Sequence, residues 1–188
     1  MTPPVPASRA GRFGRAVERF NRRLLRLTRP GPRWLAASVK LGLIMKAAAI
    51  SVGVVVVAAR LAFGHETPPS PFAAGRGVLE PAFLGVVLAP VSETALIVLV
   101  HAMTRRWLGL TGFVPVNTAL AYVNHIPTTG VPIAAALVFS AMSYQYVSFR
   151  DDVGRGRAFA GVAVSRAVCN SVPTPIAAVE GILGGPIA

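Results

Sequence analysis

The chain has 188 residues, of which 53% are hydrophobic and only 14% are charged, and its net charge is +12. Soluble domains carry about a quarter of their residues as charged side chains, so this composition argues against an ordinary soluble protein. Nine of the 19 basic residues lie within residues 9–33, and long apolar runs fill much of the remainder. No aromatic-studded basic strand or recognition-helix pattern accompanies the charge, so nucleic acid is not an expected partner.

Residues 9–27 are predicted to form an amphipathic helix. Five apolar side chains recur at steps of three or four residues and share one helical face: Phe13, Val17, Phe20, Leu24 and Leu27. Arginines fill much of the rest, which is typical of a helix in the membrane interface. A solvated tail that only sets topology is the alternative. Residues 1–33 are therefore interpreted as a basic cytoplasmic arm, and residues 34–188 as a transmembrane helical domain.

Five apolar segments are each expected to cross the membrane, because a transmembrane helix needs about 20 mostly apolar residues. They cover residues 34–63, 79–103, 108–124, 131–149 and 158–172. Pro173 and Pro175 then interrupt the pattern, and the apolar tail after them is expected to form a partial helix. The expected fold class is all-α, a multi-pass transmembrane helical bundle preceded by the amphipathic helix. The first apolar run begins late for a cleaved signal peptide and is expected to be retained.

Basic residues set the expected orientation. Five arginines outside the arm flank the predicted spans on the same side as the arm when the spans alternate: Arg105, Arg106, Arg150, Arg155 and Arg157. The positive-inside rule then places the arm and these loops in the cytoplasm. The sequence predicts a multi-pass protein of the inner cell membrane, with the lipid bilayer as its first partner.

Glu93 is the first candidate for chemistry, because it is the one acidic residue deep inside a predicted span. A carboxylate there is costly unless it is paired, protonated or hydrated. It could act as a general base, and the alternatives are a structural ion pair or proton coupling in a small transporter. His125, at the end of the third span, could point back into the bundle. Asn170, in the fifth span, could orient a water or a substrate carbonyl, or equally join two helices.

Absent motifs narrow the class of reaction. The sequence has no His-Glu-x-x-His zinc signature and no Gly-x-Ser-x-Gly motif. Its only aspartates, Asp151 and Asp152, lie in a predicted loop, so an intramembrane hydrolase would need a glutamate as its base. His101 lies about 12 Å along the helix from Glu93, and is expected to be an interfacial histidine. Cys169, the single cysteine, is expected to be a small buried residue.

Three short motifs around these residues resemble those of the CPBP family, the CAAX proteases and bacteriocin-processing enzymes, also called abortive-infection-like membrane proteins. That family carries Glu-Glu-x-x-x-Arg after Ala-Pro, then Phe-x-x-x-His, then His-x-x-x-Asn. Residues 89–94, Ala-Pro-Val-Ser-Glu-Thr, look like the first motif, residues 121–125 like the second, and residues 166–170 like the third. The resemblance covers residues 80–175, in the same order and at approximately the same spacing.

Four positions depart from the family pattern. Thr94 stands for the second glutamate, Val98 for the arginine, and Ala121 for the phenylalanine. Arg166 stands where the second histidine belongs. Its guanidinium could donate to an oxyanion, or it could pair with Glu93 and block base chemistry by direct contact.

The resemblance implies a glutamate-type intramembrane endopeptidase. Glu93 would activate a water for peptide cleavage, and His125 and Asn170 would stabilise the oxyanion. The implied substrate is a membrane-associated peptide or protein, prenylated or bacteriocin-like. No cofactor is required by the sequence, and a divalent metal such as zinc stays open. The damaged motifs favour the alternative of a non-catalytic membrane protein of the same fold, acting in immunity, scaffolding or partner binding.

Overall fold

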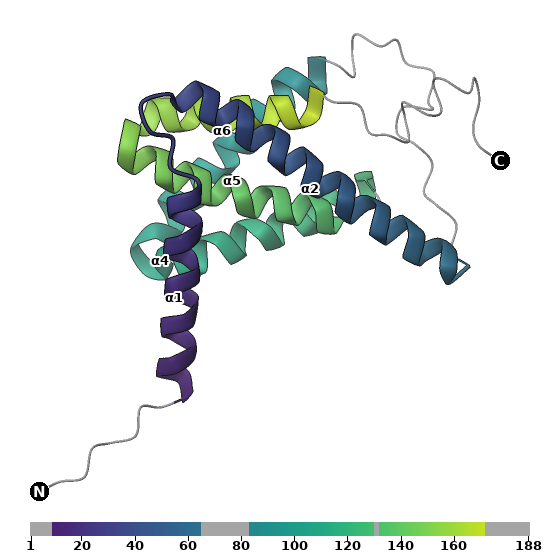
Figure 1. Ribbon diagram of the computed structural model, residues 1–188, viewed down its shortest axis with the longest axis horizontal. Helices are drawn as coiled ribbons and strands as arrows, with labels where there is room; N and C mark the ends of the chain where they lie inside the picture. The colour runs from purple at the N-terminus through teal and green to yellow at the C-terminus, as the bar shows by residue number, and fades with distance from the viewer. Residues whose placement is uncertain (1–8, 65–82, 130–131, 172–188) are drawn as a thin grey trace, which may run out of the picture.

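The computed structural model of the chain describes residues 9–64, 83–129 and 132–171, and these residues form helices without a strand among them. The elements are α1 (Arg9–Leu27), α2 (Trp34–Ala62), the π-helix η1 (Leu84–Leu88), α4 (Ala89–Thr129), α5 (Pro132–Val153) and α6 (Arg155–Ser171), as Figure 1 shows. The predicted all-α class is confirmed. In the described part, Trp34–Val56 and Leu84–Leu110 are long and apolar enough to cross a membrane. The predicted partial helix after Pro175 lies outside the described residues.

Three glycines with positive φ, Gly31, Gly109 and Gly154, lie in the turns between successive helices. Gly109, at φ 56° and ψ −161°, breaks α4 into halves that correspond to the predicted second and third spans. Gly154, at φ 87°, alone separates α5 from α6. Glycine adopts such angles without the steric cost that a Cβ would impose. The predicted gap between the spans ending at residue 149 and starting at residue 158 was therefore too long. The predicted end of the third span at residue 124 was wrong, because the helix continues to Thr129.

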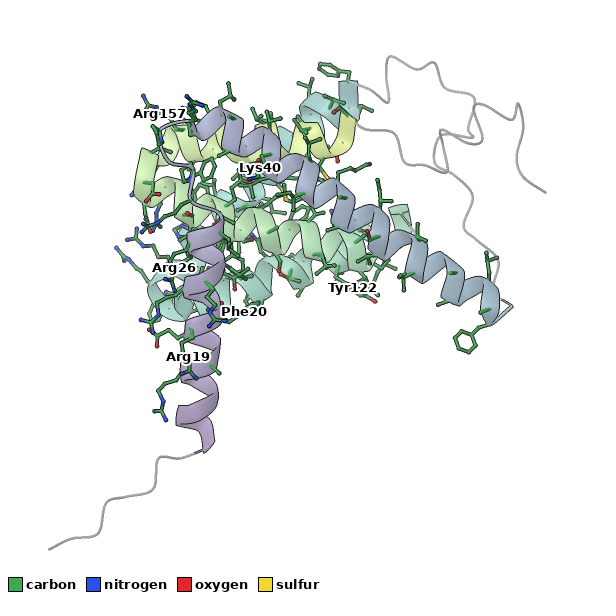
Figure 2. All side chains as sticks on the ribbon, viewed as in Figure 1. Arg19, Phe20, Arg26, Lys40, Tyr122 and Arg157 are labelled. Carbon is green, nitrogen blue, oxygen red and sulfur yellow. The ribbon has the colours of Figure 1, made fainter. Side chains whose placement is uncertain are left out.

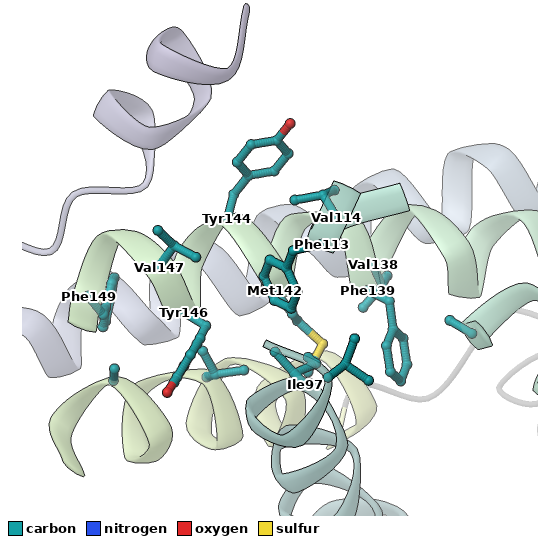
Figure 3. Close-up of a cluster of buried hydrophobic side chains, with 14 of the residues drawn as sticks. Ile97, Phe113, Val114, Val138, Phe139, Met142, Tyr144, Tyr146, Val147 and Phe149 are labelled. Atoms are coloured by element: carbon teal, nitrogen blue, oxygen red, sulfur yellow. The ribbon is translucent and has the colours of Figure 1, made fainter. Parts of the chain in front are cut away.

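Helix α5 lies at the centre of the bundle, where it packs against α2, α4 and α6. Residues 143–149 are buried one after another, so this part of α5 is covered on every side. The surrounding core is made of large apolar side chains that include Ile97, Phe113, Phe139 and Met142, each at most 2% exposed (Figure 3). A helix enclosed on all sides carries no amphipathic stripe, which explains why its faces could not be assigned from periodicity.

A polar network and a close approach join α2 to α6 inside the bundle. The Gln145 amide of α5 donates to the Ser165 hydroxyl at 2.7 Å, and that hydroxyl donates to the carbonyl oxygen of Ser38 at 2.8 Å. A Cβ placed on Gly42 would lie 2.5 Å from the Ser165 carbonyl oxygen. Small residues at such crossings let two helix backbones touch, as in membrane helix pairs.

Helix α1 has the predicted bounds and docks on α5 instead of standing free. Figure 1 shows it crossing the bundle steeply instead of running along it. The Tyr144 hydroxyl donates to the Asn21 side-chain oxygen, and the Ser148 hydroxyl donates to the Leu25 carbonyl at 3.0 Å. Phe20 is 59% exposed although it belongs to the predicted apolar face. The arm is thus anchored near its C-terminal end with part of its apolar face uncovered.

Candidate functional site

The Glu93 carboxylate of α4 is held by the Arg166 guanidinium of α6. Nε of Arg166 donates to Oε2, and Nη2 donates to Oε1 at 3.1 Å. The Glu93 side chain is only 17% exposed and the Arg166 side chain only 11%. This is a two-pronged arginine–carboxylate pair, in which planar donors match both acceptor oxygens. Of the two roles that the sequence left open for Arg166, the structure has the direct pairing with Glu93.

His125 reaches the same carboxylate from the far half of α4. Its Nε2 lies 3.9 Å from Oε1 of Glu93, and its Nδ1 lies 2.8 Å from the Ala121 carbonyl oxygen. A carbonyl only accepts, so Nδ1 carries a proton. Nε2 is then an acceptor in the neutral ring and a donor toward Glu93 in the charged ring. Glu93 and His125, two of the three residues that the resemblance assigns to one site, therefore lie together.

Phe139 of α5 closes the site on one side, and no motif pointed to it. The Arg166 guanidinium carbon lies 5.8 Å from the centre of the Phe139 ring. The His125 ring meets the same ring edge-on, also at 5.8 Å between centres. An aromatic face attracts a cation and excludes water from it. A ring that contacts both His125 and Arg166 keeps the ion pair in an apolar surrounding.

Asn170 lies one turn beyond Arg166 on α6, and its amide binds elsewhere. Its Nδ2 donates to the Gly85 carbonyl oxygen of η1 at 2.7 Å. In η1 the Ala89 N–H goes to Leu84, and the next donor would come from Pro90, which has no N–H. Asn170 supplies the donor that the proline lacks. The contact is a helix-to-helix bond, which was one of its two predicted roles.

Of the positions that depart from the resembled motifs, Thr94 and Ala121 point into the core, whereas Val98 is half-buried and lines a cavity that does not include Glu93. Thr94 is fully buried, and its hydroxyl donates to the Pro90 carbonyl at 2.6 Å. Ala121 is buried and accepts from His125 through its carbonyl. Cys169 is buried and free, as predicted. Neither side chain at positions 94 and 121 brings a charge to Glu93, so Arg166 is its strong partner.

His101 lies apart from this site, at the end of the bundle near Gly109. It is 8% exposed, and its Nε2 receives Nη1 of Arg150 at 2.8 Å. Its ring stands edge-on to Phe113 and Tyr146. His101 therefore shares no contact with Glu93, as their separation along the helix predicts.

A divalent metal would need several ligands that converge. Within residues 9–64, 83–129 and 132–171, no three side chains of His, Cys, Asp or Glu type lie close enough to share an ion. Around Glu93 the available groups are one carboxylate and one imidazole, with a guanidinium already on the carboxylate. Such a set favours an ion pair over metal ligation.

The chain matches no protein-family model, no curated protein and no solved structure in the comparisons made.

Proposed function

We propose that the chain is a multi-pass membrane protein with a CPBP-like helical arrangement that binds a membrane partner and does not cleave peptide bonds. Its spans would be α2, the two halves of α4, α5 and α6. The partner would be a membrane-associated peptide or protein, in a scaffolding or immunity role. Arg166 would stand in place of the second histidine of the resembled motifs. It would bind Glu93, so that the residue at the position of the base belongs to a structural ion pair.

The exposed surface of α2 supports a place in the membrane. Val54, Val55 and Leu61 are each at least 60% exposed, and most of the apolar window Trp34–Val56 is uncovered. A continuous apolar surface of this kind is costly in water, and it is the normal outer surface of a helix in lipid.

The basic segments support a cytoplasmic arm. Arg29 lies 3.8 Å from Asp152, and Arg150 binds His101, so the arm, the α5–α6 turn and the first half of α4 meet. Figure 2 shows Arg19, Arg26 and Arg157 along one edge of the molecule. Arginines gathered at one end of a bundle favour that end as cytoplasmic.

The two-pronged contact between Arg166 and Glu93 carries the proposal. A general base must offer a lone pair to a water that also reaches the substrate. Here both carboxylate oxygens already accept from the guanidinium, so a water would have to compete with Arg166 for them. A buried ion of either sign is costly alone, so each residue holds the other in place.

A cleavage assay tests the proposal. The full-length chain is reconstituted in liposomes with quenched fluorescent peptides, both apolar and C-terminally prenylated, and compared with Glu93→Gln. We expect no release above empty liposomes from either protein. Cleavage by the parent that Glu93→Gln abolishes would overturn the proposal.

A glutamate-type endopeptidase is the second candidate, because Nε2 of His125 lies 3.9 Å from Glu93. In that case the guanidinium would have to leave the carboxylate before water could enter. Arg166→His restores the residue type of the resembled motif and removes the pair. If the site is a peptidase held in check, that variant should cleave peptides and lose this activity when Glu93→Gln is added.

A further inference from the structure

A cavity of about 500 Å³ opens at the basic end of the bundle, between α4, α5 and α6. Its polar lining is one histidine and four arginines: His101, Arg105, Arg106, Arg150 and Arg155. The rest of the lining is apolar or aromatic, and the small side chain of Ala102 leaves room between them. The cavity is separate from the Glu93 site and is not used by the function proposed above.

The charge of this cavity is only partly balanced. Arg150 donates through Nε and Nη2 to Asp151 Oδ1, at 2.8 and 2.5 Å, and through Nη1 to His101. Arginine has no acceptor, so His101 receives this bond at an unprotonated Nε2 and adds no charge there. Arg105, Arg106 and Arg155 bring three more positive charges, and the described lining contains no carboxylate. The cavity therefore has the charge and donors to hold an anion.

An exposed apolar row runs along α4 beside the cavity lining. Leu99, Met103 and Trp107 follow one another at four-residue steps on α4 and are 56%, 67% and 84% exposed. Residues at this spacing share a helix face, and so do residues three apart. Ala102 and Arg106, which line the cavity, lie three residues beyond Leu99 and Met103 respectively, so the row runs beside the cavity lining. Tryptophan at the end of an apolar span is typical of the headgroup level of a bilayer.

We infer that this cavity binds the phosphate headgroup of an anionic phospholipid. The headgroup would lie among Arg105, Arg106 and Arg155, and an acyl chain would follow Leu99 and Met103. Guanidinium groups bind phosphate oxygens through paired donors, and basic pockets between helices on the cytoplasmic side suit such headgroups. A soluble phosphate would use the same donors but gain nothing from the apolar row. The inference rests on the proposed membrane location and is independent of the role of Glu93.

Lipid titration of the full-length protein in detergent, followed by native mass spectrometry, tests the inference. The probes are phosphatidylglycerol and phosphatidylcholine with the same acyl chains. We expect tighter binding of phosphatidylglycerol, with affinity falling about fivefold for each arginine removed in Arg105→Gln and Arg155→Gln. The matched control is Arg157→Gln, which removes the same charge from an exposed position of α6 outside the cavity lining and should leave the affinity unchanged. If the variant that combines Arg105→Gln with Arg155→Gln does not fold, Arg155→Gln alone, at an exposed position, is measured in its place.

Three results would overturn the inference. Equal binding of the two lipids would do so, and so would equal losses in the cavity variants and Arg157→Gln. Displacement of the lipid by glycerol 3-phosphate at a comparable concentration would assign the cavity to a soluble phosphate. Alkaline extraction of membranes separates this failure from that of the proposed location, because a protein released from the membrane refutes the location itself.

Discussion

The side-chain amide of Asn170 completes the hydrogen bonding of Gly85, 85 residues earlier in the chain, at 2.7 Å. The need arises locally, because Pro90 cannot donate to the carbonyl that the π-turn η1 directs toward it. The Ala-Pro pair at the start of α4 and the asparagine at the end of α6 therefore form one structural unit. A residue that the resemblance assigns to an oxyanion site is occupied with holding the two helices together.

This relationship predicts that Asn170→Ala destabilises the fold. Removing the amide leaves a backbone acceptor without its donor, which costs about 1–3 kcal/mol of unfolding free energy. The measurement is the unfolding equilibrium of the purified protein in mixed detergent micelles. Asn124→Ala, at an exposed position of α4, is the control and should change stability little. Equal effects of the two variants would refute the structural role of Asn170.

The contact of α2 with α6 predicts a strong effect at Gly42. Its added Cβ would overlap the Ser165 carbonyl oxygen and the Val168 side chain, so Gly42→Ala should cost about 1–3 kcal/mol of stability. Gly53, on the same helix, has no atom within 4 Å of an added Cβ. Gly53→Ala should therefore be neutral or slightly stabilising, since alanine favours helix. If both variants unfold alike, the close approach of α2 to α6 is wrong.

The proposed orientation predicts the accessibility of two ends of the bundle. In a Cys169→Ala background, Asp151→Cys should resist a membrane-impermeant maleimide in intact cells and react in inverted vesicles. Phe63→Cys, at the exposed end of α2, should show the opposite pattern. The Asp151 side chain is 59% exposed at the basic end, so a cysteine there is open to the reagent. Labelling of Asp151→Cys from the outer face of intact cells would contradict the proposed orientation and place the basic end outside.

The sequence predicts elements well where a local cause fixes them. Apolar runs predict the helices, and Gly109 lies close to the predicted boundary between the second and third spans because a positive φ favours glycine. The five-residue π-turn before Ala89 was missed, although Pro90 provides a reason for it. The extension of α4 past the predicted end at residue 124 was also missed, because Pro127 and Gly130 follow in the sequence and such residues usually mark a turn.

The candidate site shows where sequence reasoning ends. The resemblance groups Glu93, His125 and Asn170 in one site, and each is costly to expose to lipid. In the structure His125 lies beside Glu93, whereas the Asn170 amide binds the Gly85 carbonyl. The sequence left open whether Arg166 faces an oxyanion position or the Glu93 carboxylate. The answer depends on how α4 and α6 pack, and the two residues are 73 positions apart in the chain, so the periodicity of neither helix predicts it. Phe139 carries no motif at all, and only the packing of α5 against both partners reveals its role.

The central claim is that Glu93 forms a structural ion pair with Arg166 and does not activate a water molecule. A double-mutant cycle of unfolding free energies tests this claim most directly. Glu93→Gln and Arg166→Gln should each destabilise the protein by about 3–5 kcal/mol, because each leaves a buried charge alone. The double variant should lose much less than the sum of the two. Glu18→Gln, in the exposed Glu18–Arg22 pair at 3.3 Å, is the control and should change little. A Glu93→Gln variant as stable as the parent, or more stable, is expected of a strained catalytic base and would contradict the account.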